Sequence, residues 1–120
     1  MLFRSHIAAA GGIAAVLRKA QALNAGVEVQ IEVETLDQLR EALACGAASV
    51  MLDNISYAQM REAVALNTLS AKPALLEVSG GVEIEQVREI AATGVDRISI
   101  GRLTKDVRAV DFSMRVLERV

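Results

Sequence analysis

The stretch Ala74–Gly81, Ala-Leu-Leu-Glu-Val-Ser-Gly-Gly, decides the predicted fold of this chain. Its apolar residues indicate a strand buried on both faces of a parallel sheet, and the pattern after it predicts an amphipathic helix over residues 83–93. Gly80 and Gly81 let the backbone approach a ligand closely, in a turn that leads into this helix. The stretch therefore predicts a strand–turn–helix unit with a phosphate-binding turn, and Glu77 lies just before that turn.

The strand–helix order of this unit recurs along the chain. The hydrophobic pattern predicts further elements: a helix over residues 8–24 and strands over residues 27–34, 49–54 and 97–101. Alternating strands and helices of this length indicate parallel βαβ units. The strand-end residues Glu32, Asp53, Glu77 and Gly101 are spaced by 21, 24 and 24 residues, the unit length of a compact β/α barrel. We therefore predict an α/β fold of parallel βα repeats, about half of an irregular TIM-like β/α barrel.

Helix boundaries follow from capping residues and glycines. Thr35–Gln38 and Ser56–Gln59 have the capping-box pattern that opens a helix, and Gly46 is suited to ending one. In the helix over residues 83–93, Ile84 and Ile90 are expected to face the core. Asp111 is expected to cap a last helix over residues 111–119.

The composition limits the function classes. The 120 residues carry a formal charge of −2 and are 52% hydrophobic but only 2% aromatic, which predicts one aliphatic core. This charge balance argues against a nucleic-acid surface, and no apolar run reaches the ~18 residues of a membrane span. The run Ile7–Leu17 has the length of a signal-peptide core, but Arg18 and Lys19 follow it, and we expect a helix packed on the sheet instead. A single cysteine, Cys45, excludes internal disulfides and favours a cytoplasmic protein.

Acidic residues and glycines collect where the predicted strands end. In β/α barrels the working residues lie at the carboxyl ends of the strands. Here these ends carry Glu32 or Glu34, the pair Asp53-Asn54, the run Glu77–Gly81 and Gly101. Carboxylates gathered at one rim need a balancing cation, and hard oxygen ligands suit Mg²⁺, which usually arrives with substrate phosphates. Singly, each acid is more often a solvated rim residue or a helix cap, but together they predict a site for a phosphorylated substrate and a metal.

Six short motifs in order resemble one known family, quinolinate phosphoribosyltransferase (carboxylating nicotinate-nucleotide diphosphorylase). They are His6-Ile-Ala-Ala-Ala-Gly, Ile31-Glu-Val-Glu, Met51-Leu-Asp-Asn, Leu76-Glu-Val-Ser-Gly-Gly, Thr93-Gly-Val-Asp and Ile100-Gly-Arg-Leu-Thr. The resemblance implies the irregular barrel domain of a cytoplasmic enzyme of NAD biosynthesis that forms homodimers or larger homo-oligomers. That enzyme joins quinolinate to phosphoribosyl pyrophosphate and releases pyrophosphate and CO₂ to give nicotinate mononucleotide.

The resemblance also implies roles for individual residues. Glu32 and Asp53 match the catalytic acids that hold Mg²⁺ and the ribose hydroxyls, and Glu77 matches a buried acid near the ribose. The remaining matches bind substrate: Ser79, Gly80 and Gly81 the 5′-phosphate, Gly101 and Lys105 a second phosphate turn, and His6 the quinolinate.

The start of the chain departs from the family pattern. The family motif Lys-Asp-Asn-His is Phe3-Arg4-Ser5-His6 here, so Phe3 replaces a substrate-binding lysine, and Lys105 stands where the family often has a histidine. Leu2–Ser5 also equals the translation of the end of a common sequencing adapter. We therefore expect residues 1–5 to be a non-native leader and residues 6–120 to be part of a C-terminal barrel domain.

The portion that would carry the quinolinate-binding cluster and the first barrel strands has no counterpart in this sequence, so we expect the chain alone to be inactive. Two alternatives remain. One is a non-catalytic phosphate-binding half-barrel, and the other is the molybdenum-transport-associated relative of the same family.

Overall fold

The computed structural model describes residues 7, 9, 11–23, 26–105 and 110–114. Among them, four strands form one sheet in the order β1-β2-β3-β4, and every neighbouring pair is parallel. The strands are β1 (Gln30–Val33), β2 (Ser49–Asp53), β3 (Leu75–Ser79) and β4 (Arg97–Ile98). All four predicted strands are present, each shorter than the sequence pattern indicated. The predicted leader, residues 1–5, and His6 lie outside the described part of the chain.

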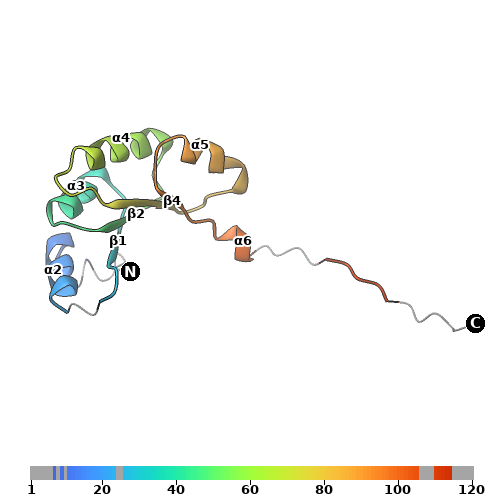
Figure 1. Ribbon diagram of the computed structural model, residues 1–120, viewed down its shortest axis with the longest axis horizontal. Helices are drawn as coiled ribbons and strands as arrows, with labels where there is room; N and C mark the ends of the chain where they lie inside the picture. The colour runs from blue at the N-terminus through green and yellow to red at the C-terminus, as the bar shows by residue number, and fades with distance from the viewer. Residues whose placement is uncertain (1–6, 8, 10, 24–25, 106–109, 115–120) are drawn as a thin grey trace, which may run out of the picture.

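Helices alternate with these strands, which confirms the predicted βα order. They are α2 (Ile13–Leu23), α3 (Leu36–Ala44), α4 (Tyr57–Thr68), the 3₁₀ turn η1 (Ile84–Gln86), α5 (Val87–Ala91) and α6 (Arg102–Lys105). Figure 1 shows α4 and α5 side by side along one side of the sheet, with α2 next to β1. The arrangement is about half of a TIM-like β/α barrel. No helix in the described ranges is long and apolar enough to span a bilayer.

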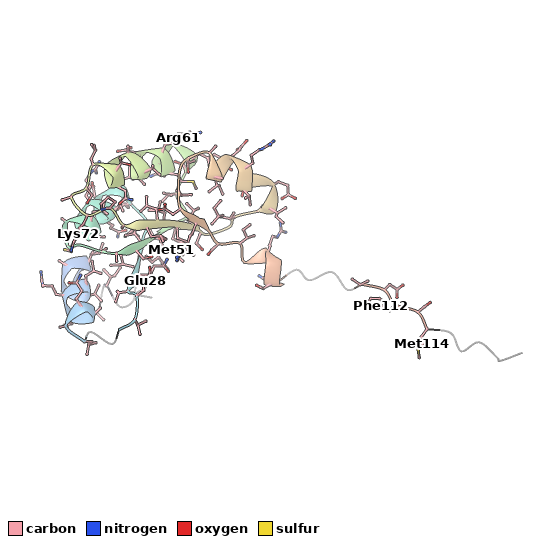
Figure 2. All side chains as sticks on the ribbon, viewed as in Figure 1. Glu28, Met51, Arg61, Lys72, Phe112 and Met114 are labelled. Carbon is pink, nitrogen blue, oxygen red and sulfur yellow. The ribbon has the colours of Figure 1, made fainter. Side chains whose placement is uncertain are left out.

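The two faces of the sheet differ in chemistry because side chains alternate along each strand. The face toward the helices is apolar: on β1, β2 and β3 its residues Ile31, Val33, Val50, Leu52, Leu76 and Val78 are buried, and Ile98 of β4 is partly buried. They pack in one core with helix residues that include Leu39, Ala63 and Ile90. We call the opposite face the inner face; it carries Gln30, Glu32, Ser49, Met51, Asp53, Leu75, Glu77, Ser79 and Arg97. Figure 2 shows Met51 on the opposite side of the sheet from Arg61 of α4.

Strand register places the predicted acids on this inner face at two levels. Glu32 is opposite Met51, and Met51 is opposite Glu77. Asp53 is opposite Ser79, one level closer to the carboxyl end of the strands. All three predicted acids lie on one face, but only Asp53 is at a strand end as expected; Glu32 and Glu77 lie one level lower, before the ends of β1 and β3.

Three predicted helices differ from the structure. The helix expected over residues 8–24 is α2, which begins only at Ile13, because Gly11 and Gly12 before it have φ values of 83° and 119° that an α-helix does not allow. The helix expected over residues 83–93 begins as the 3₁₀ turn η1, which leaves Ile84 57% exposed, while Ile90 is buried as expected. The helix predicted from Asp111 is wrong over residues 111–114, which form no regular structure, and residues 115–119 are outside the described part of the chain. Phe112 and Met114 are 88% and 92% exposed, and Figure 2 shows both side chains away from the sheet. A short amphipathic segment is not stable as a helix without an apolar surface to pack on.

Candidate functional site

Glu77 is fixed on the inner face by two neighbours from other strands. The Gln30 side-chain amide donates a hydrogen bond of 2.8 Å to Glu77 Oε2, and the Ser99 hydroxyl donates to Glu77 Oε1. The Ser99 backbone N–H also donates to the Val78 carbonyl at 2.9 Å, which extends the pairing of β4 with β3. Both carboxylate oxygens of Glu77 are therefore satisfied, and the side chain is held in one orientation.

Asp53 ends β2 and meets the turn after β3. The Asn54 side-chain amide donates to Asp53 Oδ2 at 3.0 Å, and the Asn54 backbone N–H donates to the Ser79 carbonyl at 3.2 Å. Asn54 adopts a left-handed backbone with φ of 53°, a conformation that asparagine tolerates better than most residues. This turn ties the Asp53 carboxylate to the start of the glycine turn.

Gly80 is required by this close approach. Its φ is 90°, and a Cβ at this position would lie 2.6 Å from Asp53 Oδ1 and 2.7 Å from Asn54 Oδ1. Gly81 has a φ of 61°, but a Cβ there would meet nothing within 4 Å. Glycine is therefore needed at the two positions for different reasons: at 80 because a side chain would collide with Asp53, and at 81 because of the positive φ.

Glu32 and Asp53 offer two carboxylates on one face of neighbouring strands, and both are half-buried. Within the described ranges, no three Asp, Glu, His or Cys side chains are grouped as a metal site. Magnesium is commonly held by one or two protein carboxylates and completed by water and substrate phosphates. Two half-buried carboxylates on neighbouring strands are a donor set of the kind that Mg²⁺ takes together with a phosphorylated substrate.

A pocket of about 380 Å³ lies between the glycine turn after β3 and the segment after β4. Two of its lining residues meet the acids, since Gly80 lies against Asp53 and Ser99 donates to Glu77. The pocket is lined by Ser79, Gly80, Gly81, Val82, Glu83, Ser99, Gly101, Arg102 and Lys105. The two predicted glycine sites, far apart in sequence, thus share one pocket with Lys105. After the Gly80–Gly81 turn the chain forms η1 and then α5, which is only five residues long and too short to supply a strong helix dipole here. The backbone N–H groups and the side chains of Arg102 and Lys105 therefore determine the chemistry of the pocket. These groups suit an anion.

Asn54, expected beside Asp53 at the end of its strand, does contact that acid, but four other residues of this site were not identified from the sequence. Gln30 and Ser99 hold Glu77, and Arg102 and Glu83 form an ion pair of 2.8 Å at the pocket wall. A basic residue directly after Gly101 was a usable signal for Arg102. The other contacts depend on strand register, which a single sequence does not give. His6, the predicted quinolinate contact, lies outside the described residues.

Comparison with known proteins identifies the relatives of this half-barrel. The family model for the C-terminal domain of quinolinate phosphoribosyl transferase matches residues 1–115. The chain belongs to the quinolinate phosphoribosyl transferase family. The resemblance inferred from six motifs is therefore confirmed.

The chain spans only part of the family members it matches. It is 40% identical over 117 residues to the probable carboxylating nicotinate-nucleotide pyrophosphorylase of Bacillus subtilis, covering 97% of this chain and 39% of that protein. The Rattus norvegicus carboxylating nicotinate-nucleotide pyrophosphorylase is 35% identical over 119 residues, covering 97% of this chain and 39% of that protein. The solved nicotinate-nucleotide pyrophosphorylase of Francisella tularensis superposes with a TM-score of 0.84 at 41% identity, covering 92% of this chain and 38% of that one.

Proposed function

We propose that this half-barrel binds phosphoribosyl pyrophosphate and Mg²⁺ as part of a cytoplasmic carboxylating nicotinate-nucleotide pyrophosphorylase. The observation that carries the proposal is an anion pocket, made by two glycine sites and two basic residues, whose Gly80 lies against Asp53 and whose Ser99 donates to Glu77. Glu32 lies on the same inner face, at the level of Glu77. A sugar phosphate needs both: basic groups for its phosphate and acids near its ribose. The named relatives favour this branch of the family over the molybdenum-transport-associated one.

The reaction moves a ribose from pyrophosphate to the nitrogen of quinolinate. The bond between the ribose carbon and pyrophosphate breaks, and the bond to the pyridine nitrogen forms. One quinolinate carboxylate then leaves as CO₂, and the ring carbon that carried it keeps the electron pair and takes up a proton from water. Positive charge develops on the ribose as pyrophosphate departs, and fixed carboxylates stabilise that charge without having to reorganise. Glu77 is suited to this role because Gln30 and Ser99 hold both of its oxygens.

The other residues take roles that their positions allow. Glu32 and Asp53 would hold Mg²⁺ and the ribose hydroxyls, and the ion, when bound, would neutralise charge on the departing pyrophosphate. Ser79, Gly80 and Gly81 would bind the 5′-phosphate, with Gly101 and Lys105 on the opposite pocket wall. In this proposal, quinolinate binding, including a contact from His6, and assembly into homo-oligomers depend on parts that relatives have beyond the matched segment. The chain alone is then inactive.

A chimera tests the proposal. The matching segment of the Bacillus subtilis relative is replaced by residues 7–120 of this chain, and nicotinate mononucleotide formation is measured. We expect the chimera to be active, the chimera with Asp53→Asn to lose at least about a hundredfold in activity, and residues 1–120 alone to form no product. A folded chimera that binds phosphoribosyl pyrophosphate without turnover would contradict the enzymatic assignment and favour a non-catalytic phosphate-binding module.

A further inference from the structure

The wall of the phosphate pocket carries an ion pair that the glycine turns do not explain. Arg102 Nη1 lies 2.8 Å from Glu83 Oε1, and both residues line the pocket. Arg102 directly follows Gly101 and is the first residue of α6, in the segment after β4, and Glu83 follows the Gly80–Gly81 turn after β3. The pair therefore links the two phosphate-facing turns through their side chains.

Arginine is the side chain best matched to a phosphate group. Its planar guanidinium donates two parallel hydrogen bonds to two phosphate oxygens, whereas lysine acts as a point charge. Among the described residues that line the pocket, Lys105 is the other basic one, exposed like Arg102, and Glu83 is the one acid. A carboxylate beside an anion site opposes the anion unless it has a partner, and Arg102 is the partner here.

The ion pair is weak enough to be exchanged. The Arg102 and Glu83 side chains are 60% and 51% exposed, and ion pairs at that exposure contribute little to stability because water and salt screen them. The backbone of Glu83 is fixed, since its N–H donates to the Gln86 side chain at 2.9 Å. Glu83 thus stays at the wall when its carboxylate releases the guanidinium.

We propose that Arg102 is a phosphate-binding residue of this pocket and that Glu83 is its counter-charge, which occupies the guanidinium until a phosphate displaces it. The proposal rests on the proposed function in one respect, because it requires the pocket to bind a phosphate. It adds a contact and a competitor: Arg102 increases the affinity for phosphate, and Glu83 lowers it.

The opposite signs of these two effects make the test sharp. If the ion pair only stabilised the pocket, removing either partner would break the same interaction, so both substitutions would change the phosphate affinity in the same direction. A guanidinium that binds phosphate and a carboxylate that competes for it would shift the affinity in opposite directions. Arg40 on α3 provides a matched control, since it pairs at the exposed surface with Asp37 and Glu62, away from the pocket.

The experiment titrates the full 120-residue protein with ribose 5-phosphate by calorimetry, as wild type, Arg102→Gln, Glu83→Gln, Arg102→Lys and Arg40→Gln. We expect Arg102→Gln to weaken binding about tenfold, Arg102→Lys less, Glu83→Gln to tighten it about threefold, and Arg40→Gln to leave it unchanged. Unchanged affinity in Arg102→Gln, or weakening in both Arg102→Gln and Glu83→Gln, would overturn this inference while leaving the phosphate pocket intact. No binding by the wild type would instead overturn the phosphate pocket of the proposed function. Circular dichroism melts confirm that each exposed substitution leaves the fold unchanged.

Discussion

Gln30 and Glu77 lie on strands that do not pair with each other, yet their side chains form a 2.8 Å hydrogen bond across the inner face of the sheet. The strand between them, β2, contributes Met51 at the level of Glu77. The amide thus fixes an acid of the proposed ribose site from two strands away. Ser99, beyond β4, fixes the other oxygen of the same carboxylate.

Removing this contact should loosen the acid without unfolding the protein. Hydrogen bonds to charged groups contribute about 1.5–3 kcal/mol when buried, and for this half-buried pair we expect Gln30→Ala to cost about 1 kcal/mol in urea unfolding. In the chimera with the Bacillus subtilis relative, kcat should fall more than the affinity for phosphoribosyl pyrophosphate. Gln30→Glu places a second carboxylate beside Glu77, so it should lower both the free energy of unfolding and kcat more than Gln30→Ala does. Equal behaviour of the two variants would argue against the contact.

Gly80 and Gly101 provide a matched pair for the glycine turns. Gly80→Ala forces a Cβ to within 2.6 Å of the Asp53 carboxylate at a positive φ, so we expect a loss of at least about 2 kcal/mol in the free energy of unfolding. Gly101 has open space at its Cβ position and no positive φ, so Gly101→Ala should change stability by less than about 0.5 kcal/mol. Similar losses at both positions in urea titrations would show that Asp53 does not approach Gly80.

A buried asparagine anchors the start of β3. Asn67 near the end of α4 donates to the Ala74 carbonyl at 2.7 Å and accepts from the Ala74 N–H at 2.8 Å. Asn67→Ala leaves both backbone groups without this partner, so we expect a loss of about 1–3 kcal/mol in unfolding free energy. Thr68→Ala removes an exposed hydroxyl from the same helix and should cost less than about 0.5 kcal/mol. If Asn67→Asp were as stable as the wild type, the donated bond would be unnecessary, contrary to this account.

The core under the glycine turn should be the most sensitive part of the sheet. Leu76 is 1% exposed on the central strand β3, and we expect Leu76→Ala to cost about 2–5 kcal/mol. Leu69, 85% exposed at the end of α4, serves as the control, because Leu69→Ala removes no buried surface. Thermal or urea unfolding of both variants measures the difference, and equal midpoints would mean that β3 does not pack in the core.

The fold was predictable because its signals are local. Alternating side chains such as Val29, Ile31 and Val33 defined the buried face of β1, and Ser56–Gln59 forms the predicted capping box, with hydrogen bonds in both directions. Thr35 caps α3 as predicted, but the Gln38 side chain accepts from the Glu34 N–H. The acids fell on one face because strand parity is fixed by sequence.

The unpredicted features depend on contacts between distant segments. Gln30 meets Glu77, and Glu83 meets Arg102, only after the parallel register is set. The segment from Asp111 has an amphipathic pattern, but its exposed residues Phe112 and Met114 contact no core in the described part of the chain. Periodicity states which face of a helix is apolar, but it does not state whether a surface is present to receive it.

Magnesium-dependent binding of phosphoribosyl pyrophosphate tests the central claim most directly. We expect the 120-residue protein to bind it in the presence of Mg²⁺, with affinity at least about tenfold weaker in EDTA and in Asp53→Asn. Asp37→Asn, on the exposed surface of α3, should bind like the wild type. Equal affinity with and without Mg²⁺, or an Asp53→Asn variant that binds as tightly as the wild type, would contradict a sugar-phosphate site built on the inner-face acids.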